Sequence, residues 1–156
     1  MWSASVDVAI VNDPRLAGYL KRSLDSEMAA VQQYLTQACL AAMWQLDRYS
    51  IRFRHDAEEE LGHAQQLIDQ MLKLGMTSNG SQLPAIRPGR SLEEMLLIDR
   101  ELEIGVIRLY EEAANYCARV REGELQSLFG GLLRDELEHL QDLDVLLAEV
   151  YQGATS

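Results

Sequence analysis

The chain has 156 residues, of which 47% are hydrophobic, and this is enough for one domain with a buried core. It carries 25 acidic and 14 basic residues, which gives a net charge of −11. Such a charge disfavours nucleic acid and anionic membranes as partners and favours the collection of cations, although ordinary solubility accounts for the same number. No apolar stretch reaches the length that crosses a membrane. We therefore expect neither nucleic acid nor membrane as a partner.

The first residues lack the basic start of a signal peptide and carry Asp7 inside a short Val/Ile run. Cys39 and Cys117 lie in apolar helical segments, without the spacing of a metal site or of a disulfide framework. We therefore expect both to be small core residues in the reducing cytoplasm. Residues 1–13 are expected to form an N-terminal tail, residues 14–151 one all-α domain, and residues 152–156 a C-terminal tail.

Four helices are predicted between residues 14 and 151. Asp13-Pro14 is a helix start, with Asp as the N-cap and Pro at the first helical position. An apolar stripe with a spacing of three or four residues then continues to about Leu46. After a break at residues 47–50, a second helix is predicted to stop at Gly75, a suitable left-handed cap.

Residues 75–90 are rich in Gly and Pro and predict one long connection. The segment Ser91-Leu92-Glu93-Glu94 has the pattern of a capping box that opens the third helix. Gly123 is predicted to separate this helix from the fourth. A long crossover lets the second and third helices run parallel, so the sequence predicts an up-down-down-up four-helix bundle.

Two E-x-x-H motifs, Glu60–His63 and Glu136–His139, lie in helical segments and are offset by 76 residues. Glu27 and Glu103 precede Glu60 and Glu136 by 33 residues each, so the pattern E-x32-E-x-x-H occurs twice. Because positions i and i+3 share one helix face, each motif can present a carboxylate and an imidazole to one point. Glu27 and Glu103 are also in phase with the apolar stripes of their helices, which predicts that they point into the core.

Buried carboxylates raise one another's pKa and lose hydration, so four of them need compensation. Two divalent cations would balance the four glutamates, with the two histidines as neutral ligands. Oxygen-rich sites with one imidazole per metal favour iron or manganese, while zinc binds without redox chemistry. One E-x-x-H motif is a weak signal, but the doubled pattern predicts a dinuclear site. Its six ligands are Glu27, Glu60, His63, Glu103, Glu136 and His139.

Residues 14–151 resemble bacterioferritin, a ferritin-like family. The resemblance rests on Glu27 with Tyr34, Trp44, residues 55–64, Asp99 with Glu103, and residues 134–139. It implies that the six ligands hold two iron ions, with Glu60 and Glu136 bridging or capping them. It also implies oxidation of Fe(II) by O2 or H2O2 and storage of ferric mineral in a hollow cage.

The resemblance also assigns roles to neighbouring residues. It implies that Tyr34 donates a hydrogen bond to a ligand carboxylate and supplies an electron, whereas a simple core tyrosine is the alternative. Tyr110 holds the matching place seven residues after Glu103, where the family has an apolar residue, and we leave it out of the catalytic set. Asp99 is expected to accept a hydrogen bond from a ligand imidazole, with a plain buried hydrogen bond as the alternative. His55 and Glu59 match an additional iron site of some bacterioferritins, or they belong to a solvated helix face.

Two departures from the family pattern change the expectations. Leu61 replaces the methionine that ligates haem on the dimer axis, so we expect no haem in a self-dimer, although a haem-binding partner subunit is still able to contribute one methionine. The sequence stops at Ser156, whereas the family continues into a fifth helix that lines the four-fold channel. We expect a dimer to tolerate this difference more readily than a cage.

The sequence thus predicts a haem-free ferroxidase for iron storage and detoxification. One alternative is a non-cage di-metal oxidase or peroxidase similar to rubrerythrin, and the absence of a C-x-x-C pair speaks against it. A second alternative is a structural subunit of a mixed bacterioferritin cage, and the complete ligand set speaks against that hypothesis.

Overall fold

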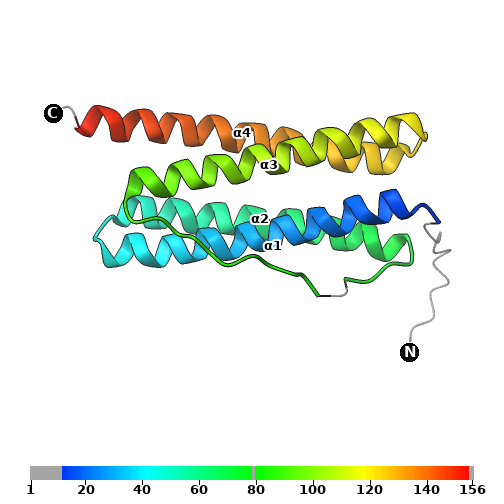
Figure 1. Cartoon of the computed structure of the whole chain (residues 1–156), viewed down its shortest axis with the longest axis horizontal. Helices are drawn as coiled ribbons and strands as arrows, with labels where there is room; N and C mark the ends of the chain where they lie inside the picture. The colour runs from blue at the N-terminus through cyan, green and yellow to red at the C-terminus, as the bar shows by residue number, and fades with distance from the viewer. Residues whose placement is uncertain (1–11, 79, 155–156) are drawn as a thin grey trace.

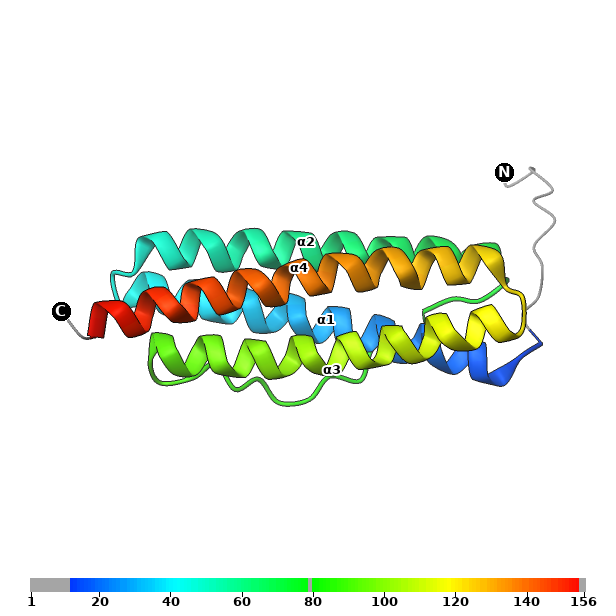
Figure 2. The same cartoon turned by 90° about the horizontal axis from the view of Figure 1, so that it is seen from above.

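A computed structural model of the chain describes residues 12–78 and 80–154. It consists of four helices, which are α1 (Pro14–Met43), α2 (Asp47–Lys73), α3 (Leu92–Arg119) and α4 (Gly123–Ala154). Helices α1 and α2 form one antiparallel hairpin, and α3 and α4 form the other (Figure 1). The crossover between α2 and α3 returns along the bundle, so α2 and α3 run parallel (Figures 1 and 2). The predicted up-down-down-up bundle is confirmed, and the tail expected before Asn12 lies outside the described residues.

The predicted helix starts are present with their capping side chains. The Asp13 carboxylate accepts hydrogen bonds from the backbone N–H groups of Arg15 (2.9 Å) and Leu16 (3.3 Å). Ser91 caps α3 by accepting from the N–H of Glu94 at 3.1 Å. The return bond of the capping box is displaced by one residue, since the Glu94 carboxylate accepts from the N–H of Arg90 at 2.8 Å. These bonds satisfy donors that the first helical turn leaves open.

The two hairpin turns repeat at the same 76-residue offset as the metal-ligand motif. Gln45 ends α1 and Arg121 ends α3 in the left-handed region, with φ values of 61° and 60°. In each turn the following N–H closes a Schellman bond of 2.9 Å, from Leu46 to the carbonyl of Ala41 and from Glu122 to the carbonyl of Cys117. The crossover end of α2 also uses a left-handed residue, the predicted Gly75 with a φ of 74°.

The predicted limits of the hairpin turns were wrong by a few residues. α1 ends at Met43 rather than near Leu46, and α2 begins at Asp47, inside the expected break. Gly123 is the first residue of α4 and not the separating residue. The reason is that Gln45 and Arg121 hold the left-handed conformation that sequence patterns assign to glycine.

Two apolar clusters fill the bundle. One includes Leu67, Tyr110 and Phe129, and the other includes Phe53 and Leu96. The ionisable residues of the doubled motif are also buried, at the points where their helices face one another. Burial of this kind requires a compensating partner for each charge.

The two cysteines differ in environment. Both are free thiols, and Cys117 is buried as predicted. Cys39 is exposed, so the expectation of a core position for it was wrong, because it falls outside the buried stripe of α1. None of the described helices combines the length and hydropathy needed to cross a membrane.

The left-handed residues give a test of the turn geometry. We expect Gln45→Gly and Arg121→Gly each to raise the free energy of unfolding by about 1 kcal/mol, because glycine avoids the steric cost of a positive φ. Chemical denaturation of the metal-free protein measures the change.

The matched controls are Ala42→Gly and Ala118→Gly in the last turns of α1 and α3, where glycine should lower the same free energy by about 1 kcal/mol. Loss of stability in Gln45→Gly or Arg121→Gly would contradict the turn assignment.

Candidate metal centre

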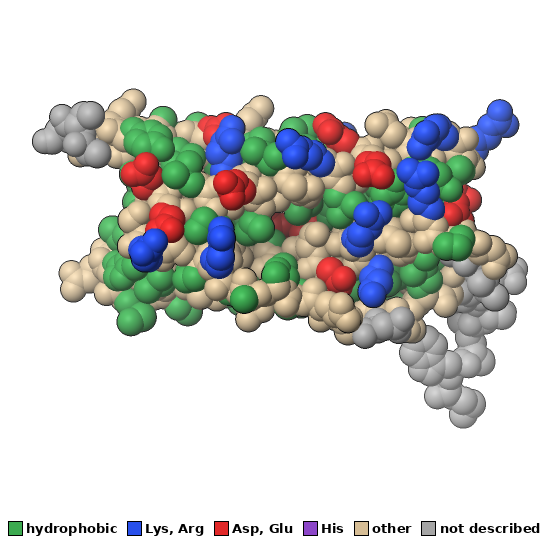
Figure 3. All heavy atoms as spheres, viewed as in Figure 1, with side chains coloured by type: hydrophobic (Ala, Val, Ile, Leu, Met, Phe, Trp, Pro, Cys, Tyr) green, Lys and Arg blue, Asp and Glu red, His purple; other side chains and the backbone are tan. Residues whose placement is uncertain are grey.

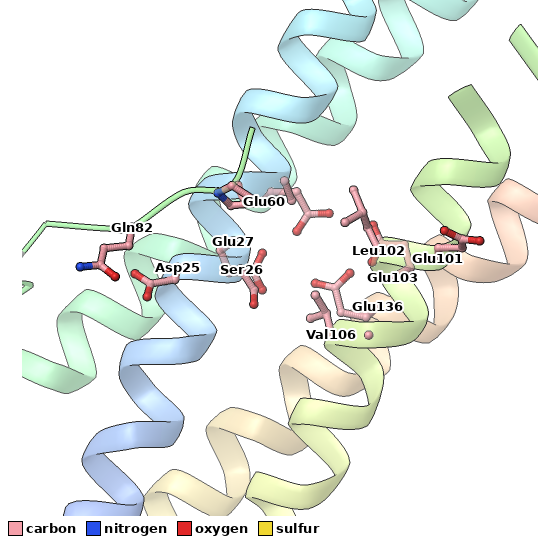
Figure 4. Close-up of a pocket in the computed structure, with 14 residues that line it drawn as sticks. Asp25, Ser26, Glu27, Glu60, Gln82, Glu101, Leu102, Glu103, Val106 and Glu136 are labelled. Carbon is pink, nitrogen blue, oxygen red and sulfur yellow. The ribbon is translucent and has the colours of Figure 1, made fainter. Parts of the chain in front are cut away.

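Four helices bring the six predicted ligands to one place. α1 provides Glu27, α2 provides Glu60 and His63, α3 provides Glu103, and α4 provides Glu136 and His139. All six side chains are buried, with exposed fractions between 1% and 8%. Figure 4 shows the four glutamate side chains directed toward a common space between the two hairpins.

The ligand atoms form two overlapping groups. The first contains Glu27, Glu60, His63 and Glu136, and the second contains Glu60, Glu103, Glu136 and His139. Within each group the candidate ligand atoms lie within 4.8 Å of one another. Glu60 and Glu136 belong to both groups, which is the arrangement expected of two carboxylates shared by a pair of cations.

The oxygen positions of Glu60 and Glu136 agree with this shared role. Oε2 of Glu60 lies 3.1 Å from Nδ1 of His63, and its Oε1 lies 2.9 Å from Nδ1 of His139. Glu136 shows the reverse arrangement, with Oε1 2.8 Å from His63 and Oε2 3.2 Å from His139. Each shared carboxylate therefore turns one oxygen toward each half of the centre.

Two of these oxygens test whether the site fits cations. Oε1 of Glu60 and Oε1 of Glu136 are fully buried and form no aligned hydrogen bond, although each lies within 2.9 Å of a histidine nitrogen. A buried oxygen without an aligned donor is destabilising unless another electrophile binds it. Two divalent cations would supply that partner, and the set of carboxylates and imidazoles suits iron, manganese or zinc. The residues present therefore fit a dinuclear site.

The outer nitrogen of each histidine contacts a carboxylate from the other hairpin. Nε2 of His63 lies 3.2 Å from Oδ2 of Asp135, and Nε2 of His139 contacts Oε2 of Glu59. Because a carboxylate accepts hydrogen bonds, these contacts place the proton on Nε2 and direct Nδ1 toward the centre. The two carboxylates hold the imidazole rings in the orientation that metal binding needs.

The predicted role of Asp99 was wrong. Among the described residues neither of its carboxylate oxygens forms an aligned hydrogen bond, and its polar neighbours are the amides of Gln37 and Gln33. The imidazoles use Asp135 and Glu59 instead. Burial raises the pKa of Asp99 well above its usual value, which favours the neutral acid. A usable signal was present in the sequence, since Glu59 and Asp135 each directly precede the glutamate of an E-x-x-H motif.

Two tyrosines contact the glutamates that are not shared. The hydroxyl of Tyr34 donates to Oε1 of Glu103, and the hydroxyl of Tyr110 donates to Oε1 of Glu27. Both phenols are buried. The contact of Tyr34 with a ligand carboxylate agrees with the expectation, whereas sequence reasoning assigned no contact to Tyr110.

The four ligand glutamates form two pairs whose pKa values shift in opposite directions. Burial raises the pKa values of Glu27 and Glu103 well above the usual range, which favours their neutral forms. Burial acts in the same direction on Glu136, but contacts with His139 and His63 outweigh it and lower the pKa of Glu136. Burial opposes the charging of His139, yet its contacts with Glu136 and Glu60 raise its pKa to about 12. Without cations, two imidazolium ions thus balance two shared carboxylates.

Pockets adjoin the centre on two opposite faces. A pocket of about 310 Å³ lies between α1, α3 and the crossover, and its lining includes Asp25 and Gln82 together with the four glutamates. Figure 3 shows this face, with mixed acidic and basic side chains at its surface. A second pocket of about 350 Å³ lies between α2 and α4 and includes His63 and His139. The carboxylates are therefore reached from one face and the imidazoles from the other.

The additional predicted ligands lie beside the second pocket. His55, Asp56 and Glu59 form a third group whose candidate ligand atoms lie within 4.8 Å of one another. Nδ1 of His55 is 3.7 Å from Oε1 of Glu59, and His55 is exposed. Leu61, at the position of the haem-binding methionine in the resemblance, is 53% exposed on α2.

The fold and the paired site define a ferritin-like protein, and the family model for the ferritin-like domain matches residues 17–152. Bacterioferritin from Rhodobacter capsulatus is 31% identical over 136 residues, which cover 87% of this chain and 84% of that protein. A bacterial ferritin from Synechocystis sp. is 31% identical over 125 residues, 80% of each chain. A solved structure of the Rhodobacter capsulatus bacterioferritin, with a metal-free dinuclear site and haem iron, superposes with a TM-score of 0.88. That match has 29% identity and covers 92% of this chain and 89% of the other.

The chain therefore belongs to the bacterioferritin family.

The protonation pattern predicts proton release on metal binding. We expect binding of two Co(II) or Zn(II) ions to release about four protons, one from each imidazole and one each from Glu27 and Glu103, because ligands bind in their deprotonated forms. Protons compete with the cations, so the affinity should rise as the pH rises from about 6 to about 8, because both imidazoles of the metal-free protein are protonated throughout this interval. Titration with a pH indicator in weakly buffered solution measures the release. An affinity independent of pH would contradict this assignment.

The carboxylates behind the histidines give another test. We expect Asp135→Ala to weaken Co(II) binding about 10- to 100-fold, because His63 loses the acceptor that orients its ring. Glu138→Ala is the matched control, since Glu138 lines the same pocket, whereas the outer nitrogens of the two imidazoles contact Asp135 and Glu59. Absorbance of bound Co(II) measures both affinities, and equal values for the two variants would reject the role of Asp135.

Proposed function

We propose that the protein is a ferroxidase that binds two Fe(II) ions as substrate and oxidises them to Fe(III), for iron storage and detoxification. The observation that carries the proposal is the pair of overlapping ligand groups that share Glu60 and Glu136. A site for one cation would need only one group. Membership of the bacterioferritin family and the structural match support the same function.

The reaction balances with either oxidant. Two Fe(II) ions give one electron each, and O2 takes these two electrons and two protons to form H2O2. When H2O2 is the oxidant, the two electrons and two protons yield two molecules of water. A pair of iron ions thus delivers two electrons together, which limits the release of one-electron oxygen radicals.

The chain's own residues have separate roles in this proposal. Glu60 and Glu136 hold both ions at a fixed separation, because each turns one oxygen to either side. His63 and His139 bind through Nδ1, and Glu27 and Glu103 complete the two subsites. We include Tyr34 in the catalytic set as a phenol that donates a hydrogen bond to a ligand carboxylate.

The two pockets provide an entry path and an exit path for iron ions. We propose that Fe(II) enters between α1 and α3, where carboxylates line the pocket, and that product leaves between α2 and α4. His55 and Glu59 would then bind an additional iron ion on the exit side. Their geometry supports this role, since both line the pocket that contains the two ligand histidines.

We propose self-association as a dimer and as a ferritin-type cage in the cytoplasm, where Cys39 and Cys117 remain thiols. Leu61 offers no thioether, so the proposal includes no haem in the self-dimer. Manganese and zinc fit the same ligands. In the proposed function, however, only Fe(II) is both the electron donor and the metal that is stored.

The ferroxidase proposal is tested with Glu103→Gln. The variant keeps the size of the side chain and an acceptor for Tyr34, and it resembles the neutral form that burial favours, so the metal-free fold should persist. Fe(II) oxidation, followed by Fe(III) absorbance after mixing with O2 or H2O2, should slow roughly 100-fold because one subsite loses its carboxylate. Glu111→Gln, at an exposed position of α3, is the control. Wild-type rates in Glu103→Gln would reject the site assignment.

Iron loading distinguishes storage from a non-cage enzyme. We expect iron to co-elute with a large assembly in size-exclusion chromatography at far more than about two ions per chain. Retention of about two ions by a small oligomer would favour the rubrerythrin-like alternative. Absence of Fe(II) oxidation by the isolated chain would favour a structural subunit.

A further inference from the structure

The two tyrosines of the centre form a crossed pair. Tyr34 follows Glu27 by seven residues, but its hydroxyl donates to Glu103 on the other hairpin. Tyr110 follows Glu103 by seven residues, and its hydroxyl donates to Glu27. The two tyrosines are 76 residues apart, as are the two halves of the ligand motif. In each subsite, the glutamate that is not shared accepts a hydrogen bond from a phenol of the opposite hairpin.

Tyr110 is as deeply buried as Tyr34. Its side chain is 0% exposed, and that of Tyr34 is 2% exposed. The ring of Tyr110 packs against Phe129 of α4 with 6.0 Å between the ring centroids. The phenol therefore has a fixed position from which its single O–H donates to Oε1 of Glu27.

This hydrogen bond restricts the orientation of the Glu27 carboxylate. With Oε1 occupied by the phenol, Oε2 lies 3.6 Å from Nδ1 of His63, on the side of the shared carboxylates. The remaining contents of the two subsites are equivalent, since each has one imidazole, one glutamate of its own and both shared glutamates. Without Tyr110, only Glu103 would have a phenol to fix its orientation.

We propose that Tyr110 is a positioning residue that holds Glu27 in its binding orientation, so that the two subsites bind divalent cations with matched affinity. The inference rests on the proposed function only in assuming that the centre binds two divalent cations. It concerns binding and does not require oxidation. Tyr34 performs the mirrored task for Glu103.

Titration with Co(II), followed by its d–d absorbance, tests the inference. We expect the wild-type protein to bind two Co(II) ions per chain in one phase, as the two ligand groups require. In Tyr110→Phe, which retains the ring against Phe129, one ion should bind about 10- to 100-fold more weakly, because a ligand loses the group that orients it. Tyr34→Phe should show a similar loss.

Anomalous diffraction from crystals with one Co(II) ion per chain identifies the affected subsite. In Tyr110→Phe the ion should occupy the subsite of Glu103 and His139, and in Tyr34→Phe it should occupy the subsite of Glu27 and His63. This exchange between variants would not result from general loosening of the core. Tyr19→Phe is the matched control, because Tyr19 is fully buried and donates to Glu112, outside both ligand groups.

The outcomes separate this inference from the proposed function. A Tyr110→Phe titration equal to that of the wild type, or equal weakening of both subsites, would overturn the positioning role. Wild-type protein that binds fewer than two Co(II) ions would overturn both proposals. Two matched Co(II) sites in a protein that fails to oxidise Fe(II) would reject the ferroxidase proposal and leave the role of Tyr110 intact.

Discussion

The balance of charge among buried groups is the constraint on which this structure depends. Four glutamates meet inside a helical bundle, where loss of hydration and mutual repulsion both oppose ionisation. In the metal-free protein, protonated His63 and His139 offset Glu60 and Glu136, and burial favours neutral Glu27 and Glu103. Two divalent cations would balance all four glutamates with neutral imidazoles. The centre is thus close to neutral without cations and would be close to neutral with two of them, so metal binding would displace protons.

The supporting contacts of the centre cross between the hairpins. Asp135 on α4 contacts His63 on α2, and Tyr110 on α3 contacts Glu27 on α1. Each ligand group also takes residues from both hairpins, because Glu60 and Glu136 are shared. Neither hairpin contains a complete subsite, so bound cations would join the two halves. The free energy of metal binding would then contribute to the association of the hairpins.

Much of the fold could be predicted because its signals are local. Apolar spacing of three or four residues placed the helices, and Asp13, Ser91 and Gly75 marked the ends where side-chain caps or glycine act. The hairpin turns were misplaced because Gln45 and Arg121 adopt positive φ without being glycine. A residue of this kind carries no turn signal in the sequence. The exposed Cys39 shows a similar limit, since its apolar neighbours along the chain do not determine which way its side chain faces.

The sequence by itself determined the six candidate ligands, because E-x-x-H places two groups on one helix face and the repeat supplies the rest at fixed spacing. Only the tertiary structure decided which neighbours support them. It replaced Asp99 with Asp135 and Glu59 as the acceptors behind the histidines, and it gave Tyr110 a contact with Glu27. The Asp135 and Tyr110 contacts join residues 72 and 83 positions apart. Such pairs depend on how one hairpin is rotated against the other, and the packing of the whole core sets that rotation rather than any local pattern.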